Sequence, residues 1–120
     1  MNNAIKFDSD KPFRPELLSP ELILQVSEVL AFGAKKYADR DWEKGMSWGR
    51  PFGALMRHMW AWWGGEQKDA ETGFSHLAHA GCCLMFLMAY ESRKIGIDDR
   101  TIQSGEPALL ELERSLQKKK

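Results

Sequence analysis

The chain has no surplus of charge of either sign. Its 120 residues include 17 Lys and Arg and 17 Asp and Glu, so the formal net charge is zero. Nucleic-acid backbones attract proteins with an excess of basic residues, and we therefore expect no nucleic-acid partner. No apolar run is long enough to cross a bilayer, and residues 1–10 hold no apolar signal segment. We accordingly expect no membrane partner and a cytoplasmic location, in the host cytoplasm if a phage encodes the chain.

Cysteine is scarce, and the glycine-rich phosphate loops are missing. Cys82 and Cys83 are the only two cysteines, and adjacent cysteines do not form an ordinary structural bridge. They lie in an apolar run, so we expect buried free thiols in a reducing compartment. Neither a Walker pattern nor a dinucleotide fingerprint occurs, which excludes those two nucleotide-binding classes.

The alternation of apolar and polar residues that is typical of strands is also absent, and apolar residues recur at helical spacing instead. Ser19-Pro20-Glu21 is typical of a helix start, and Gly64-Gly65 is typical of a helix end. We expect helices at about 20–37, 51–63, 75–92 and 108–116. The sequence thus predicts an all-α fold, a small helical bundle, with one domain over residues 1–95 and a C-terminal helical extension with a basic tail over 96–120.

The helix at 51–63 is apolar on nearly every side. Between Phe52 and Trp63 only Arg57 and His58 are polar. A helix without a polar face is buried all round, so we expect it at the centre of the bundle, sealed by a second subunit of a homo-oligomer. A buried Arg57 needs a partner, which is either a carboxylate such as Glu28 or a substrate phosphate.

Every histidine of the chain falls in one helix-turn-helix unit, which also holds an acidic turn. The six residues are His58, Glu66, Asp69, Glu71, His76 and His79. An antiparallel helical hairpin would bring them together, and such donors suit Mg²⁺ or Mn²⁺. Other interpretations stay open: His58 as a core residue, Asp69 or Thr72 as the N-cap of the following helix, and an exposed Glu71.

Tryptophan is abundant, with five in the chain. An indole ring can stack on a nucleobase. Trp42 lies in the segment 38–50, which we expect to be a loop, and it is our preferred stacking residue. We expect most of the other tryptophans in the core.

Several strings, in this order, resemble the phage and bacterial dATP/dGTP diphosphohydrolase domain. They are Lys6-Phe7-Asp8, Lys11-Pro12, Leu17-Leu18-x-Pro20-Glu21, Val29 to Tyr37, Trp42, Arg57-His58-x-x-Ala61-Trp62, Gly65-Glu66-x-x-Asp69, Thr72-Gly73 and His76-Leu77-Ala78-His79-Ala80. That family is similar to the MazG-type all-α NTP pyrophosphohydrolases. The resemblance implies an oligomeric (dimeric or tetrameric), Mg²⁺-dependent enzyme that cleaves a purine dNTP to the monophosphate and pyrophosphate. The sequence departs from the MazG pattern in one respect, since no Glu-x-x-Glu motif precedes the expected site.

On this basis we assign roles to individual residues as expectations. The expected metal ligands are Glu28, Glu66, Asp69, His76 and His79. The expected catalytic residues are Glu66, Asp69, Arg57 and Lys35. The expected substrate-binding residues are Lys6, Asp8, Lys11, Lys36, Trp42 and His58. The alternatives are a non-catalytic helical module that binds a nucleotide or a protein, and an HD-type phosphohydrolase, although the chain contains no His-Asp dipeptide.

Overall fold

The computed structural model describes residues 11–101 and 108–118 of the chain. Its elements, in order, are η1 (Pro15–Leu17), α2 (Pro20–Lys36), η2 (Asp41–Lys44), α3 (Gly49–Trp63), α4 (His76–Arg93) and α5 (Ala108–Lys118). Within these ranges there is no strand, only two isolated bridges. The predicted all-α fold is confirmed. In the same ranges, every helix is too short or too polar to cross a lipid bilayer.

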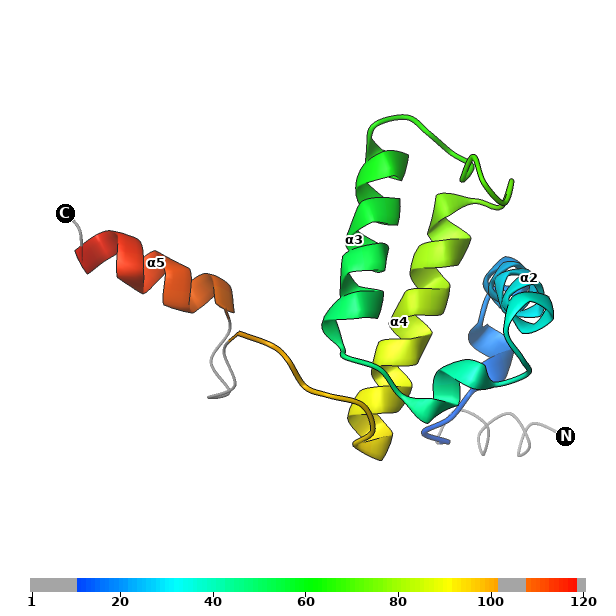
Figure 1. Cartoon of the computed structure of the whole chain (residues 1–120), viewed down its shortest axis with the longest axis horizontal. Helices are drawn as coiled ribbons and strands as arrows, with labels where there is room; N and C mark the ends of the chain where they lie inside the picture. The colour runs from blue at the N-terminus through cyan, green and yellow to red at the C-terminus, as the bar shows by residue number, and fades with distance from the viewer. Residues whose placement is uncertain (1–10, 102–107, 119–120) are drawn as a thin grey trace, which may run out of the picture.

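Helices α3 and α4 form an antiparallel hairpin, and α2 packs against α4 (Figure 1). Gly81 of α4 faces α2, where an added Cβ would lie 3.1 Å from Val26 Cγ2. The missing side chain therefore allows the two helices to approach closely. Helix α5 lies apart from this three-helix body in Figure 1.

The start of α2 follows the sequence signals. Ser19 is the N-cap, its Oγ accepts the N–H of Leu22, and Pro20 opens the first turn. The helix ends at Lys36, one residue before the predicted end. Gly64 caps the end of α3 as expected.

Helix α3 begins at Gly49, two residues earlier than predicted, because a distant carboxylate caps it. Asp99 Oδ1 accepts the Gly49 N–H at 2.8 Å, which satisfies one of the free donors of the helix N-terminus and places a negative charge there. The segment before Asp99 is bonded to the residues before α3: Trp48 N–H donates to Ile97 O, and Trp48 Nε1–H donates to Ile95 O. Residues 95–99 are thereby fastened to the body.

The N-cap of α4 is neither of the two residues considered from the sequence, Asp69 and Thr72. Ser75, not Asp69 or Thr72, caps the helix, since its Oγ accepts the Leu77 N–H at 3.1 Å. Ser75 directly precedes the helix, as the cap geometry requires. This leaves the side chains of Asp69 and Thr72 to other partners.

The expectation that α3 is buried on every side is wrong for the single chain. Pro51 is its only buried residue, whereas Phe52, Trp60 and Trp63 are 54%, 75% and 83% exposed. Helix α3 packs on α4 along one side, and no described part of the chain covers the opposite side. The expectation that most tryptophans other than Trp42 lie in the core fails for the same reason.

Cys82 is buried, Cys83 is half-buried, and both are free thiols, as predicted. Burial, with Cys83 beside it, raises the pKa of Cys82 to about 12, and burial also raises the pKa of Cys83.

We expect Cys82 to resist thiol reagents in the folded protein. A pKa near 12 rather than 9 lowers the thiolate fraction at neutral pH on the order of a thousandfold, and the thiolate is the reactive form. Titration with a chromogenic disulfide at pH 7.5 should register Cys82 only after a denaturant is added. Rapid reaction of both thiols in the native protein would show that Cys82 is not buried.

Candidate functional site

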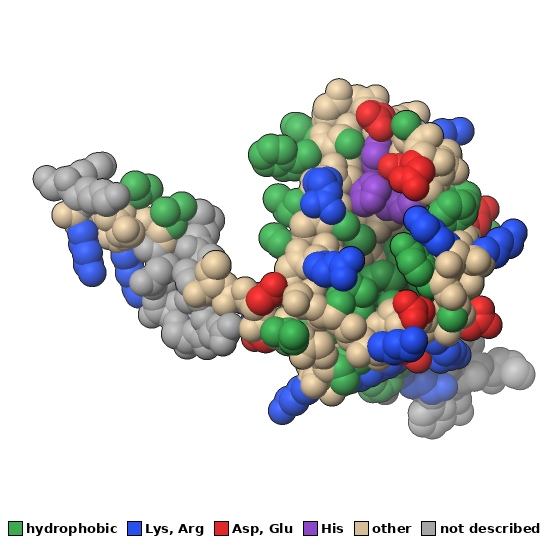
Figure 2. Space-filling view, in the orientation of Figure 1, with side chains coloured by type: hydrophobic (Ala, Val, Ile, Leu, Met, Phe, Trp, Pro, Cys, Tyr) green, Lys and Arg blue, Asp and Glu red, His purple; other side chains and the backbone are tan. Residues whose placement is uncertain are grey.

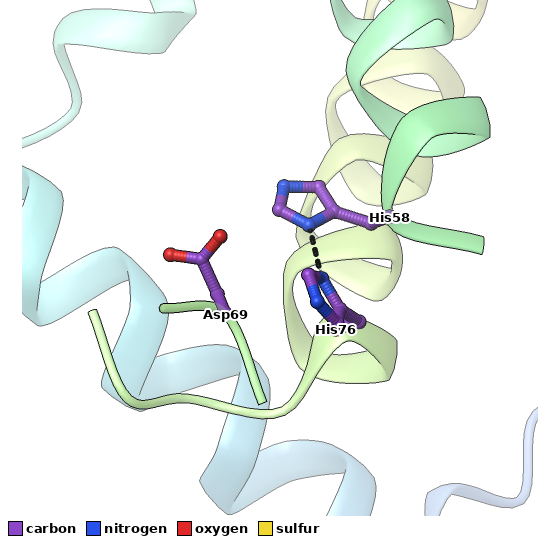
Figure 3. A group of neighbouring side chains, drawn as sticks. All are labelled: His58, Asp69 and His76. Carbon is purple, nitrogen blue, oxygen red and sulfur yellow. Dashed lines mark hydrogen bonds between the residues drawn. The ribbon is translucent and has the colours of Figure 1, made fainter. Parts of the chain in front are cut away.

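The α3–α4 hairpin gathers all three histidines into one cluster. His58 comes from α3, while His76 opens α4 and His79 follows one turn later. The Nδ1 atoms of His58 and His76 lie 2.9 Å apart, and the rings of His58 and His79 stack in parallel with centroids 4.5 Å apart. The connection between the helices adds Asp69 to the same place (Figure 3).

Neighbouring side chains orient the imidazole rings. The Glu66 carboxylate accepts a hydrogen bond from His76 Nε2–H at 2.9 Å. Thr72 Oγ1 donates to Asp69 Oδ2 at 3.0 Å and lies 2.7 Å from His79 Nε2, so it accepts from that nitrogen. The Thr72 backbone N–H also donates to Asp69 Oδ2. A carboxylate accepts only, so Glu66 fixes the proton of His76 on Nε2 and leaves the Nδ1 lone pair facing His58.

Three of these side chains are arranged as a metal site. His58, Asp69 and His76 each offer one ligand atom, and these atoms all lie within 4.8 Å of one another (Figure 3). The hydrogen bond from His76 to Glu66 matches the carboxylate–histidine pair that commonly supports a metal-binding imidazole. His76 is only 4% exposed. The residues present therefore fit a divalent cation.

The local electrostatics favour the protonation states that a cation needs. Burial, together with the imidazoles of His79 and His76, lowers the pKa of His58, and burial lowers the pKa of His79. Burial opposes ionisation of Asp69, but the two hydrogen bonds from Thr72 outweigh it and lower the pKa of this carboxyl group. These directions favour neutral imidazoles at His58 and His79 and an ionised carboxylate at Asp69, the forms in which such groups bind a metal.

The lowered histidine pKa values make the metal-free protein less stable in mild acid. The unfolded chain takes up protons near the ordinary histidine pKa of 6.5, before the folded chain does. Stability is therefore full above pH 6.5 and falls as the pH drops below it. Urea unfolding of chelator-treated protein at pH 7.5, 6.5 and 5.5 should show this decline, and a His58→Asn, His79→Asn double variant should flatten it. An unchanged midpoint across the series would contradict these shifts.

A groove of about 1000 Å³ adjoins the histidine cluster. Its walls are the second half of α2, the segment 37–46, Arg50 and one side of α4, where His79, Cys82 and Phe86 line it. Figure 2 shows the histidines and a hollow lined by apolar side chains on the same face of the molecule. A ligand with an apolar body and a charged end thus fits the groove and the cluster together.

Two arginines of α3 lie near this site: Arg50 lines the groove, and the charge of Arg57 acts on His58 and Cys83. They are seven residues apart and so share one side of the helix, and Figure 2 shows the basic side chains over α3 beside the histidines. Arg57 is exposed and makes no ion pair with a described residue. The expected burial of Arg57 is therefore wrong, and pairing with Glu28 does not occur. The guanidinium of Arg57 lies along the helix towards Gly53, where a Cβ would be 3.4 Å from its Nη1.

Trp42, which we expected to stack on a base, lines the groove but already packs within the protein. Its ring stacks on Phe86 with centroids 4.9 Å apart, and the Arg93 guanidinium lies over the ring at 5.6 Å. Tyr90, which is fully buried, donates its hydroxyl hydrogen to the Trp42 carbonyl. Trp42 thereby fastens the 41–44 turn to α4.

The remaining expected site residues lie elsewhere. Glu28, Lys35, Lys36 and Lys11 are exposed and do not line the groove, and Lys36 lies over the Tyr37 ring. Lys6 and Asp8 fall outside the described residues. Glu66 bonds to His76, and His79 stacks on His58 and lines the groove, but neither belongs to the three-residue group of His58, Asp69 and His76.

Neither Arg50 nor the bridging role of Thr72 was predicted from the sequence. A signal for Arg50 was present, since it precedes Arg57 by two helical turns on the same side of α3. No local sequence pattern indicated the role of Thr72, because its hydrogen bond to His79 depends on how the connection between α3 and α4 folds back on α4.

Comparison with known proteins decides the family. The family described as "dATP/dGTP diphosphohydrolase, N-terminal" matches residues 2–100. The chain belongs to this family. A dATP/dGTP diphosphohydrolase of Salmonella phage PMBT28 is 34% identical over 115 residues, which cover 95% of this chain and 39% of that relative. The chain thus spans about two fifths of the relative's length, and no solved structure matches it.

The match to the dATP/dGTP diphosphohydrolase N-terminal family includes every residue of the histidine cluster as well as Arg50 and Arg57. It also includes Asp99, the cap of α3, whereas α5 lies beyond the matched residues.

Proposed function

We propose that this chain hydrolyses a purine deoxynucleoside triphosphate, dATP or dGTP, to the monophosphate and pyrophosphate with the help of Mg²⁺ or Mn²⁺. The observation that carries the proposal is the convergence of His58, Asp69 and His76 within 4.8 Å beside a groove of about 1000 Å³. The phage relative's name supports the substrate class.

In this proposal, His58, Asp69 and His76 hold the cation. When bound, a divalent ion neutralises phosphate charge and supplies a more acidic water molecule. Glu66 keeps the proton of His76 on Nε2, and Thr72 holds Asp69 and His79 in place. Glu66 and His79, which we first expected to be ligands, thereby act as positioning residues.

Arg50 and Arg57 are proposed to bind the phosphate oxygens. A guanidinium offers paired N–H donors that match phosphate geometry. Both side chains are exposed, Arg50 lines the groove, and Arg57 is close enough to His58 for its charge to act on that ring. Arg57 directly precedes His58 in the chain, so a phosphate bound to Arg57 would lie near the cation site. The apolar groove wall, which includes Phe86 and Leu30, accommodates the base.

Removing the guanidinium of Arg57 should weaken catalysis without affecting the fold. Its side chain is exposed and makes no ion pair with a described residue, so Arg57→Ala should leave the melting temperature within a few degrees. We expect kcat/KM for dGTP to fall on the order of a hundredfold, the usual loss for one donor to a developing charge. Steady-state kinetics of Arg57→Ala and of Arg57→Lys measure this, and wild-type kcat/KM in Arg57→Ala would remove Arg57 from the proposed site.

The function is tested with a panel of the canonical NTPs and dNTPs. Purified full-length chain is incubated with each nucleotide in Mg²⁺, in Mn²⁺ and in EDTA, and the products are separated by anion exchange. We expect dGMP or dAMP with pyrophosphate, and no turnover in EDTA. Nucleotide binding without product would favour the non-catalytic module instead.

We also propose that a second copy of this chain covers the outer face of α3. Phe52, Met56, Trp60 and Trp63 form an exposed apolar stripe on α3, and large exposed apolar patches mark interaction sites. A homodimer through α3 would bury this stripe.

Introducing charge into the stripe should therefore produce monomers. Trp60→Glu is expected to halve the mass measured by light scattering after size exclusion, because a buried charge in an apolar interface is costly. Leu17→Glu, which alters an exposed residue of η1 (70% exposed), serves as the control and should keep the wild-type mass. A monomeric wild type would contradict the proposed dimer.

A further inference from the structure

The ligand atoms at the histidine cluster differ from those that an Mg²⁺ site offers. Two of the three are imidazole nitrogens, from His58 and His76, and one is a carboxylate oxygen, from Asp69. Mg²⁺ binds oxygen almost exclusively and keeps several of its water molecules, whereas imidazole suits first-row transition metals. Two histidines and one carboxylate make up a well-known donor set for such ions.

From this we infer that His58, Asp69 and His76 form a centre selective for a first-row transition metal ion such as Mn²⁺, Fe²⁺ or Co²⁺, with Mg²⁺ entering only on the triphosphate. This inference rests on the proposed function for its biological use, although the metal preference is a property of the chain alone.

The protonation pattern presents nitrogen lone pairs to an ion. Glu66 Oε1 lies 2.9 Å from His76 Nε2 and can only accept, so it orients the ring with Nδ1 towards His58 Nδ1, 2.9 Å away. Two such nitrogens that face each other share one proton when alone, or one cation when both donate lone pairs. A carboxylate behind a ligating imidazole also raises the basicity of that ligand.

One ion can reach both nitrogens that face each other. The Nδ1 atoms of His58 and His76 lie 2.9 Å apart, close to the roughly 3.0 Å between adjacent ligands that each lie about 2.1 Å from an ion. Asp69 adds a carboxylate oxygen, and the three ligand atoms of the group all lie within 4.8 Å of one another.

The burial of the ligands works against a hydrated ion. His76 is 4% exposed, and His58 and Asp69 are half-buried. An ion here must give up water on the protein side, and Mg²⁺ dehydrates reluctantly. Mg²⁺ can instead reach the site bound to the exposed phosphate oxygens of the nucleotide, where it keeps most of its water molecules.

The test is metal binding by the full chain after chelator treatment, with no nucleotide present. Isothermal titration should give one Mn²⁺ per chain, bound on the order of tenfold or more tighter than Mg²⁺. Pulsed electron paramagnetic resonance of the bound Mn²⁺ should show coupling to imidazole ¹⁴N nuclei. That signal comes from the wild-type protein and does not depend on whether a variant folds.

Two variants locate the site. His58→Gln should weaken Mn²⁺ binding at least tenfold and remove part of the ¹⁴N coupling, since a ligand to the ion is lost. Glu71→Gln, which alters an exposed carboxylate of the same connection outside the three-residue group, should retain one Mn²⁺ per chain. Equal affinity for Mg²⁺ and Mn²⁺, or Mn²⁺ without ¹⁴N coupling, would overturn the inference.

The two proposals fail in different ways. If Mn²⁺ binds with nitrogen coupling but no dNTP is hydrolysed, the metal preference stands and the proposed function falls. If dNTPs are hydrolysed while Mg²⁺ and Mn²⁺ bind equally well, the proposed function stands and the metal preference falls.

Discussion

Replacing Asp69 by Asn should abolish dGTP and dATP turnover while leaving the helical fold intact. The change removes the only carboxylate of the three-residue metal group and keeps the size of the side chain. Asn also retains an oxygen that accepts the Thr72 N–H, which lies 3.0 Å from Asp69 Oδ2. We expect kcat to fall on the order of a thousandfold, as when a principal electrostatic contact is lost. Pyrophosphate release measures the first effect, and circular dichroism measures the second.

The matched control for this change is Glu71→Gln. Glu71 is a carboxylate in the same connection, but it is exposed and lies outside the metal group. Its replacement should leave kcat within a few-fold of wild type. Full activity in the Asp69→Asn variant would remove Asp69 from the catalytic site, whatever the control shows.

Adding one methyl group at Gly96 should destabilise the fold severely. Gly96 has φ +83°, and a Cβ there would lie 2.4 Å from the Met46 carbonyl oxygen and 3.1 Å from Trp48 Nε1. The left-handed conformation and this overlap with the backbone together cost about 3 kcal/mol or more. That is a large part of the roughly 5–15 kcal/mol that stabilises a typical domain. Gly96→Ala should therefore lower the urea midpoint sharply or prevent folding.

Gly33→Ala is the matched control. Gly33 lies inside α2, and no atom falls within 4 Å of the position that its Cβ would occupy. Alanine favours a helix over glycine by up to about 1 kcal/mol, so this variant should match or exceed wild-type stability. If Gly96→Ala unfolded at the same urea concentration as Gly33→Ala, the tight fastening of residues 95–99 would be contradicted.

Local chemistry explains why much of the fold was predictable from the sequence. Ser19 with Pro20 marks the start of α2, and Gly64 marks the end of α3, because capping depends on residues next to each other in the chain. The cap of α3 could not be predicted, since Asp99 lies 50 residues from Gly49 in the sequence. Only the folded chain brings that carboxylate to the helix end.

The sequence predicted that α3 is buried on all sides with the help of a second subunit, and the single chain leaves its outer side exposed. The sequence of a helix that is apolar on all sides does not show whether its outer side packs against the same chain or against another molecule. Trp60 and Trp63 therefore look like core residues in the sequence and are exposed in the single chain.

The region of the site was predictable, but its internal geometry was not. The spacing of His58, His76 and His79 indicated that a hairpin would gather them. Which nitrogens meet depends on the register of α3 against α4, which the sequence pattern leaves open. The pairing of His58 with His76, and the bond from Glu66 to His76, became visible only in the structure.

The central claim is that the α3–α4 hairpin holds a cation against a triphosphate. The most direct test is a crystal of the full chain grown with Mn²⁺ and a non-hydrolysable dGTP analogue, with data collected at a wavelength where manganese scatters anomalously. We expect an anomalous peak bonded to His58, Asp69 and His76 and to an oxygen of the triphosphate. A nucleotide bound in the crystal with its manganese away from these three side chains would contradict it.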